Sequence, residues 1–253
     1  MEMSQSSKRM FYISIPAFVI FFAAVFYVKI FVPAPDCHSK PAEQINIVFD
    51  KTKPYSDTQA HSIDRTLVEV LTAAMDNAEI NLYYITSDPE HPYLVLNQCK
   101  PATHGNALLV DVDKQKRDFS RLVIRKVKEK IDLRFAPRSA APIIESLSTI
   151  SRQRIVTSKL DDKVNVQFDL YSDMVQVSEN VSLEDRNRCT SIVHGTPVDP
   201  EGVYGDVKQF FRNIPVHVYG IHRSPATFSA YPGERCIRSF WEDAFPHLTW
   251  VAL

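Results

Sequence analysis

The feature that most constrains this chain is an uncharged apolar segment close to its N-terminus. Residues 10–28 (MFYISIPAFVIFFAAVFYV) contain no charged side chain, and residues 30–32 extend the apolar run beyond Lys29. A helix rises about 1.5 Å per residue, so a run of this length matches the hydrocarbon core of a bilayer, which is about 30 Å thick. The sequence therefore predicts one transmembrane helix over residues 10–32.

Charged residues on the two sides of this segment predict its orientation. Lys8 and Arg9 precede the segment, whereas Asp36 follows it. The positive-inside rule keeps residues 1–9 in the cytoplasm and sends the rest of the chain across the membrane. We therefore expect a single-pass protein of the cell inner membrane, with a C-terminal domain in the periplasm or another extracytoplasmic space.

A cleaved signal peptide is the alternative interpretation of the apolar segment. The apolar part of such a peptide is normally only about 7–15 residues long, and Pro35 stands where cleavage would have to occur. Without cleavage, residues 33–44, which contain three prolines, form a short stiff stalk. Residues 45–253 remain as one large domain of ordinary size.

Strands and helices alternate along that domain. The first helix follows a capping-box pattern at Ser56 and Gln59 and places apolar residues as far as Met75 on one face. This alternation predicts an α/β fold, with a mainly parallel, doubly wound (Rossmann-like) sheet that carries helices on both faces. Strands are expected over residues 45–49, 80–86, 93–97, 164–171, 216–221 and 249–253, and further helices over 114–131, 141–151, 203–213 and 234–245.

Charge and aromatic content narrow the classes of partner. The chain has 29 basic and 30 acidic residues, so it lacks the basic excess of a nucleic-acid-binding protein. The basic cluster over residues 121–130 has apolar residues at helical spacing and indicates the solvated side of an amphipathic helix, with a phosphate-binding patch as the alternative. Core packing is expected for the late aromatic residues Phe210, Phe211, Phe240, Trp241 and Phe245.

Four cysteines follow the apolar segment and none precedes it: Cys37, Cys99, Cys189 and Cys236. An even number of cysteines in an exported domain is compatible with disulfides, and no CxxC pair indicates a zinc cluster. Two bridges allow three connectivities, which the sequence leaves open. A Cys189–Cys236 bridge is favoured because both residues follow late strands, and a nucleophilic Cys99 is the less favoured alternative.

Two acidic residues directly follow predicted strands. Asp50 comes after the first strand and Asp173 after a later, central one. In open α/β sheets, ligands lie beyond the carboxyl ends of the strands, near the topological switch point. Hydroxyl groups lie near both acids in the sequence, at Thr52, Ser56 and Ser172. Carboxylate and hydroxyl oxygens are hard donors, which suit Mg²⁺ or Ca²⁺.

The same segments resemble the von Willebrand factor type A-like domains. The metal-ion-dependent adhesion site of that family uses an Asp-x-Ser-x-Ser loop after the first strand, a Thr before a middle helix and an Asp after the fourth strand. The chain has Asp50-Lys-Thr52, then residues 141–147 (APIIESL), then Ser172-Asp173-Met at these places. It is also similar to single-pass membrane-anchored bacterial proteins with a DxT-type loop, an SDM segment and a late Phe-Trp helix.

The resemblance implies a cation site and a protein partner bound through the cation. Mg²⁺ is the implied ion, with Mn²⁺ or Ca²⁺ as alternatives. The chain departs from the family at Pro54, which takes the third loop position, and at Ala141, which takes the place of the Thr. The implied site is therefore degenerate. Its ligands would be Asp50, Thr52, Ser139 and Asp173, with Ser56 and Ser172 as additional oxygen donors.

No motif of a known enzyme class occurs in the chain. Phosphate loops, GxGxxG fingerprints, GxSxG elbows and HExxH pairs are missing from the sequence. An aspartyl phosphatase needs a second acid at the position of Thr52, and His217 is expected to be a core or surface histidine. The predicted function is therefore a membrane-tethered protein-binding module. The alternatives are a structural subunit of an envelope or transfer complex, and a Mg-dependent phosphoester hydrolase that uses Asp50.

Overall fold

The computed structural model describes most of the second of two units of the chain. The first unit, residues 1–36, contains the predicted transmembrane segment and lies outside the described residues. Within the described part, no helix is both long and apolar enough to span a membrane. The described residues are Cys37, 41–52, Tyr55, 57–100, 112–130, 140–154, 164–179, 181–183, 202–220 and 234–252.

Six strands form one sheet in the order β3-β2-β1-β4-β5-β6. All neighbouring strands are parallel except β3, which pairs antiparallel with β2 at one edge. The strand order reverses between β1 and β4, so the topological switch point lies there. The strands are β1 (Glu43–Asp50), β2 (Glu79–Ile85), β3 (Tyr93–Cys99), β4 (Asn165–Ser172), β5 (Val216–Gly220) and β6 (Leu248–Ala252).

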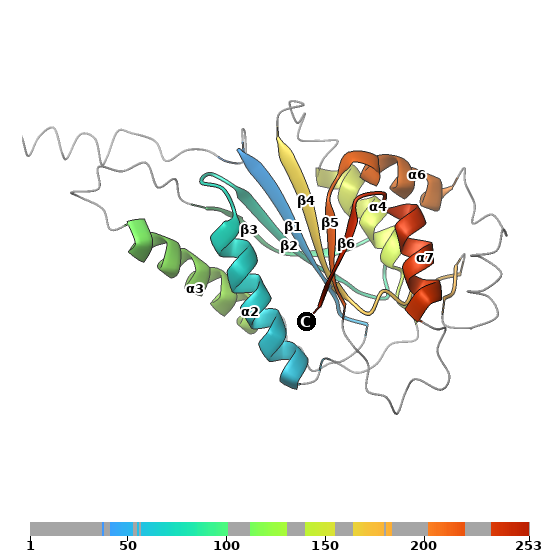
Figure 1. The fold of residues 1–253 in the computed structure, drawn as a ribbon, viewed down its shortest axis with the longest axis horizontal. Helices are drawn as coiled ribbons and strands as arrows, with labels where there is room; N and C mark the ends of the chain where they lie inside the picture. Colours follow the sequence, from blue (N-terminus) through green and yellow to red (C-terminus); the bar gives the residue numbers. More distant parts are fainter. Residues whose placement is uncertain are drawn as a thin grey trace, which may run out of the picture. The chain divides into compact units, whose positions relative to one another are not determined.

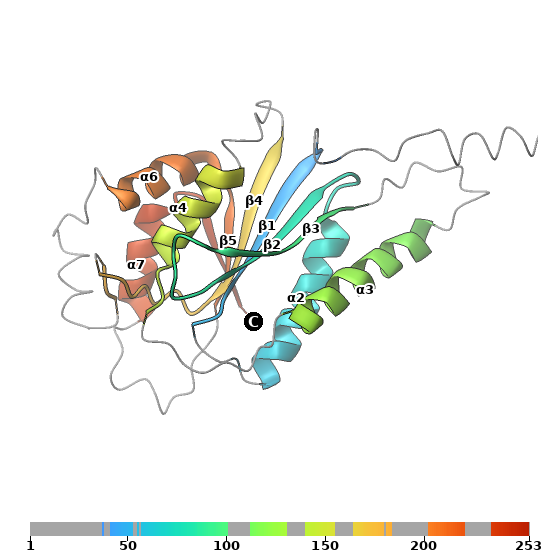
Figure 2. The ribbon, with the colours of Figure 1, turned by 180° about the vertical axis from the view of Figure 1, so that it is seen from behind.

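Helices cover both faces of this sheet, as Figures 1 and 2 show from opposite sides. Two helices, α2 (Asp57–Ala73) and α3 (Val112–Lys130), lie on one face. The other face carries α4 (Ile143–Arg154), α6 (Val203–Phe210), which continues into a short 3₁₀ turn at Phe211–Asn213, and α7 (Glu234–Ala244). The three layers confirm the mainly parallel, doubly wound α/β fold that the alternating sequence pattern predicts.

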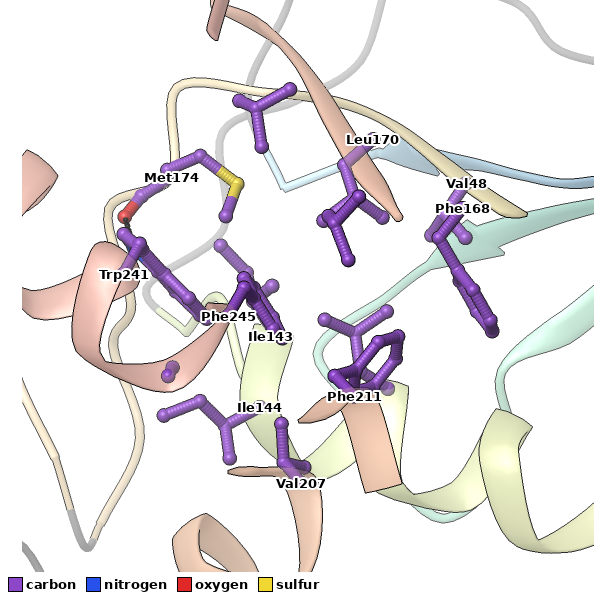
Figure 3. Close-up of a cluster of buried hydrophobic side chains, with 14 of the residues drawn as sticks. Val48, Ile143, Ile144, Phe168, Leu170, Met174, Val207, Phe211, Trp241 and Phe245 are labelled. Carbon is purple, nitrogen blue, oxygen red and sulfur yellow. Dashed lines mark hydrogen bonds between the residues drawn. The ribbon is translucent and has the colours of Figure 1, made fainter. Parts of the chain in front are cut away.

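Each face of the sheet has its own apolar core, because the strands are buried on both sides. On the side of α2 and α3, Ile47 and Phe49 pack against Leu67 and Leu71. On the other side, the close-up in Figure 3 shows side chains from β1, β4, α4, α6 and α7 in one cluster. Core packing is thus confirmed for four of the five predicted late aromatic residues, which are at most 3% exposed: Phe211, Phe240, Trp241 and Phe245. The fifth, Phe210, is only partly buried.

The ends of the helices differ from the sequence prediction in two places. Met75 was expected on the buried face of the first helix, but its side chain is 48% exposed because α2 ends at Ala73. The middle helix begins at Ile143 and not at Ala141, since Ala141 forms an isolated β-bridge with Val177. That bridge brings the chain before α4 next to the segment after β4.

A row of three asparagines, of which Asn46 and Asn81 are buried and Asn97 is partly buried, crosses the sheet through adjacent strands. Asn46 pairs with Asn81 in the β1–β2 register, and Asn81 pairs with Asn97 in the β2–β3 register. The amide of Asn97 donates to the side-chain oxygen of Asn81 at 2.6 Å, and Asn81 donates to that of Asn46 at 3.3 Å. Asn46 in turn donates to the backbone oxygen of Gln167 on β4, so the row links four strands.

A disulfide joins Cys37 to Cys99 at the end of β3. The next residue, Lys100, is only 2% exposed, and its ammonium group donates to the backbone oxygens of Leu71, Thr72 and Ala74. Lys100 therefore caps the C-terminal end of α2, where carbonyl groups lack helical partners. Cys236 in α7 is also disulfide-bonded. Its favoured partner, Cys189, lies outside the described residues, so that pairing stays a prediction.

Candidate cation site at the ends of β1 and β4

Asp50 and Ser172 meet at the switch point of the sheet. They are the last residues of β1 and β4, which run parallel, with Phe49 opposite Tyr171 in the register. The Ser172 hydroxyl donates to Oδ2 of Asp50 at 2.8 Å. The structure thus brings together two predicted site residues that are 122 positions apart in the sequence.

Thr52 closes the other side of the Asp50 carboxylate. Its backbone N–H and its hydroxyl donate to Oδ1 of Asp50 at 2.9 and 2.6 Å. Asp50 is 4% exposed and Thr52 is fully buried, so water reaches this carboxylate poorly. Among the described residues, no lysine, arginine or histidine forms an ion pair with Asp50. A buried carboxylate whose partners in the described part of the chain are neutral donors fits a divalent cation, because burying a charge is costly without a counter-charge.

The Tyr55 side chain connects the ends of β1 and β4. Its hydroxyl donates to the backbone oxygen of Asp50 at 2.6 Å and lies 3.1 Å from that of Tyr171. Burial, with a smaller contribution from the Asp50 charge, raises the pKa of Tyr55 well above its ordinary value of 10.0. The phenol therefore stays a donor at any physiological pH. Nothing in the sequence singles out Tyr55 for this role except its place shortly after the Asp50 loop.

Asp173 belongs to a tightly held turn that follows β4. One of its carboxylate oxygens accepts the backbone N–H of Val175 at 3.0 Å, and Ser172 Oγ accepts the N–H of Met174 at 2.9 Å. Met174 has a positive φ of 57°, a conformation that a residue with a side chain adopts at a cost of about 1 kcal/mol or more. Such backbone strain persists only where surrounding contacts fix the chain, and two residues supply those contacts, one from α7 and one from the turn segment itself.

Trp241 and Gln176 are those two residues. The indole N–H of Trp241 in α7 donates to the Met174 carbonyl at 2.7 Å, the contact drawn as a dashed line in Figure 3. The buried Gln176 carboxamide accepts the backbone N–H of Ile144 at 3.0 Å and donates to Glu145 at 2.8 Å. The turn that carries Asp173 is thereby attached to α7 and to the start of α4.

Part of the expected ligand set cannot be placed. Ser56, Ser139 and Pro54 lie outside the described residues. Ala141, at the position of the family's Thr, is buried and pairs through its backbone with Val177, beside the Asp173 turn. Within the described ranges, no three His, Cys, Asp or Glu side chains converge on one point. Of the expected ligands and additional donors, the hydrogen bonds described above join Asp50, Thr52 and Ser172.

A second polar cluster lies on the α2 face of β4 and β5. Asp169 is completely buried and accepts from Gln167 and Tyr219, while His217 Nδ1 lies 3.0 Å from its Oδ1. The hydrogen bond to Asp169 raises the pKa of His217 above its ordinary 6.5, although partial burial acts in the opposite direction. This pair gives the histidine, which the sequence places in the core or on the surface, a structural role as counter-ion to a buried acid.

The Asp169–His217 pair predicts a pH dependence of stability. A histidine whose pKa is raised on folding stabilises the protein fully below pH 6.5 and loses that contribution as the pH rises through the raised pKa. We expect the free energy of unfolding, from urea titrations between about pH 6 and 9, to fall with pH relative to His217→Gln. The control is His247→Gln at an exposed position, which should keep the wild-type slope. Equal slopes in wild type and His217→Gln would contradict the prediction.

Comparisons with known proteins find similar structures at low sequence identity. No protein-family model matches the chain, and no curated protein matches it. Similar solved structures include an aerotolerance-related membrane protein from Bacteroides fragilis (11% identity, TM-score 0.44, covering 83% of this chain and 91% of that chain). Another is a von Willebrand factor type A protein from Catenulispora acidiphila (12%, 0.45, 84% and 39%). A third is the manganese-loaded TRAP protein of Plasmodium vivax (13%, 0.46, 85% and 70%). The strand order and layers are those of the mainly parallel, doubly wound α/β sheet that the sequence predicts.

Proposed function

We propose that this protein is a membrane-tethered, extracytoplasmic binding module that holds a divalent cation at the ends of β1 and β4 and binds an acidic group of a protein partner through it. The observation that carries the proposal is the Asp50 carboxylate. It is 4% exposed, it is contacted by hydroxyls from two separate strand ends, and it has no cationic side-chain partner among the described residues.

The residues of the site have distinct parts in this proposal. Asp50 supplies the negative charge. The hydroxyls of Thr52 and Ser172, which donate to Asp50 in the structure, rotate when the ion binds so that their oxygen lone pairs face it. Asp173, in the turn next to Ser172, adds a second carboxylate. Mg²⁺ usually keeps several waters, so one water can be exchanged for an acidic side chain of the partner.

The disulfide supports the proposed location outside the cytoplasm. The bond between Cys37 and Cys99 persists in oxidising compartments and is rare in the cytosol. A transmembrane helix over residues 10–32 with its N-terminus in the cytoplasm would place residue 37 and everything after it in such a compartment. The predicted topology and the cysteine chemistry therefore agree.

The cation is tested by calorimetry on the full chain in detergent. We expect Mg²⁺ and Mn²⁺ to give binding heat and to raise the melting temperature, and Asp50→Asn to weaken binding at least about tenfold, a loss of about 1.4 kcal/mol. Thr52→Val should weaken binding less, because it removes one neutral ligand. Asp118→Asn, an exposed carboxylate of α3, is the matched control and should bind as wild type does. No heat and no thermal shift in the wild type would remove the cation from the proposal.

The partner is tested by crosslinking in membranes. Proteins recovered with the wild type in Mg²⁺ should be lost with EDTA and with the Asp50→Asn/Asp173→Asn variant. Partners that are retained in both cases would contradict cation-mediated binding and would favour the structural-subunit alternative.

A further inference from the structure

The most strongly charged element of the described chain is helix α3. Its nineteen residues contain eight Lys and Arg against three Asp and Glu, a net charge of +5, in a chain whose total is -1. The cations are ordered on the helix surface. Lys114, Arg117, Arg121 and Arg125 follow one another at spacings of three and four residues, so they form a single stripe. We call these four residues the basic stripe.

The basic stripe is directed away from the domain. All four of its residues are exposed, whereas Phe119 and Val123 on the opposite side of α3 are buried in the core that α2 and α3 share. Acidic neighbours within α3 contact the stripe only loosely: Asp118 lies 3.6 Å from Arg121, and Glu129 lies 3.7 Å from Arg125. Exposed pairs of this kind are weak, so they leave the positive potential of the stripe largely in place.

The N-terminal part of α3 lies near the point at which the chain enters the domain. Cys99, which is bonded to Cys37, directly precedes Lys100. Burial lowers the pKa of Lys100, the negative charge of Asp76 raises it, and the positive charge of Lys116 in α3 lowers it. Helix α3 also contacts β3, the strand that ends at Cys99.

The disulfide makes the connection to the proposed transmembrane helix very short. This step rests on the proposed function, because it requires the tether. If the membrane helix ends at residue 32, only residues 33–36 lie between it and Cys37, which is fixed to β3. A fully extended chain spans at most about 3.6 Å per residue, so this connection is at most about 18 Å long. The proposed tether is therefore short.

We propose that the basic stripe of α3 binds the anionic headgroups of the membrane into which the protein is anchored. The partner follows from charge and the length of the tether: a positive stripe on a domain joined to the membrane by a short connection is complementary to anionic lipid headgroups. Basic residues are attracted to anionic lipid over a range set by the Debye length, about 8 to 10 Å at physiological salt. Asp50 lies at the opposite end of β1 from Cys99, because Gln44 near the start of β1 pairs with Glu79, and Glu79 pairs with Cys99. Lipid binding by α3 would thus leave the candidate cation site free for a partner.

The test uses the full chain reconstituted into phosphatidylcholine vesicles with and without phosphatidylglycerol. A Gln115→Cys variant carries a fluorophore on α3, and a Gln209→Cys variant carries it at an exposed position of α6, on the other face of the sheet. Added cysteines can be labelled selectively, since the described part of the chain has no free cysteine. Lipids with a spin-labelled headgroup then quench a fluorophore that lies at the membrane surface.

We expect quenching at position 115 to be about twofold stronger with phosphatidylglycerol, and to fall to the phosphatidylcholine level in high salt or in Arg117→Glu/Arg121→Glu/Arg125→Glu. Position 209 should show no lipid dependence. A chain that resists carbonate extraction but is quenched equally in both lipids would overturn the lipid-binding proposal alone, and would leave the stripe to an acidic protein. A chain that carbonate removes from the vesicles would overturn the tether, and with it the lipid contact.

Discussion

Replacing Cys37 and Cys99 together with alanine should lower the free energy of unfolding by about 4 kcal/mol. The disulfide closes a loop with a sequence separation of 62, and a crosslink of that span removes much of the conformational entropy of the unfolded chain. Urea unfolding of the full chain in detergent, followed by circular dichroism, measures the loss. The expected effect is a large share of the total stability of an ordinary domain, which is about 5 to 15 kcal/mol.

The single variants Cys37→Ala and Cys99→Ala are the controls for this prediction. Either one breaks the same bond, so both singles and the double variant should agree within about 1 kcal/mol. Losses that add up from the two singles to the double would mean that the two side chains stabilise the fold by packing and not through the bond. Unchanged stability in all three variants would show that the bridge does not constrain the unfolded chain.

Truncating Trp241 to alanine should cost about 3 to 5 kcal/mol and should also loosen the turn that carries Asp173. The side chain is fully buried in the core of Figure 3, where it stacks on Phe245 at a centroid distance of 5.3 Å. Trp241→Phe keeps most of this packing but leaves the Met174 carbonyl without its donor, at a cost of about 1 to 3 kcal/mol. Both variants should weaken Mg²⁺ binding, because Met174 lies next to Asp173.

The other tryptophan provides the matched control. The indole N–H of Trp250 donates to Glu242 at 3.2 Å, and this contact is exposed. Trp250→Phe should therefore change stability by less than about 1 kcal/mol and leave the cation affinity unchanged. If Trp241→Phe lowers stability but binds Mg²⁺ as tightly as the wild type, the hydrogen bond to Met174 has no part in positioning Asp173.

The layered fold could be predicted from the sequence because its strands are short apolar runs between amphipathic helices. The strand around Ile47 and the helix face that includes Leu67 both follow directly from that pattern. The short connection over residues 86–92 accounts for the antiparallel direction of β3, because a parallel crossover needs about a dozen residues or more. Met75 continues the helical period in the sequence, but the helix ends two residues earlier, where the buried Lys100 caps it from a distant strand.

The candidate site could be predicted only in outline. Asp50 and Asp173 were expected at one rim because parallel strands end on the same edge, and the structure places Ser172, the neighbour of Asp173, 2.8 Å from Asp50. The roles of Tyr55 and Trp241 depend on contacts between residues far apart in the chain, for which spacing carries no signal. Asp169 and His217 likewise stand 48 positions apart, and only the β4–β5 register reveals that they are partners.

The asparagine row of Asn46, Asn81 and Asn97 has a consequence for how this protein reaches a single folded state. Strands that are apolar on both faces lack the contrast between a buried face and a solvated face that normally fixes their register. Pairings shifted by one residue would therefore bury nearly as much apolar surface. A displacement by one residue would break the hydrogen bonds between these amides, and each buried amide left without a partner would cost about 1 to 3 kcal/mol. The row therefore favours one alignment of β1, β2 and β3, and the bond from Asn46 to Gln167 joins it to β4, the strand that ends at Ser172.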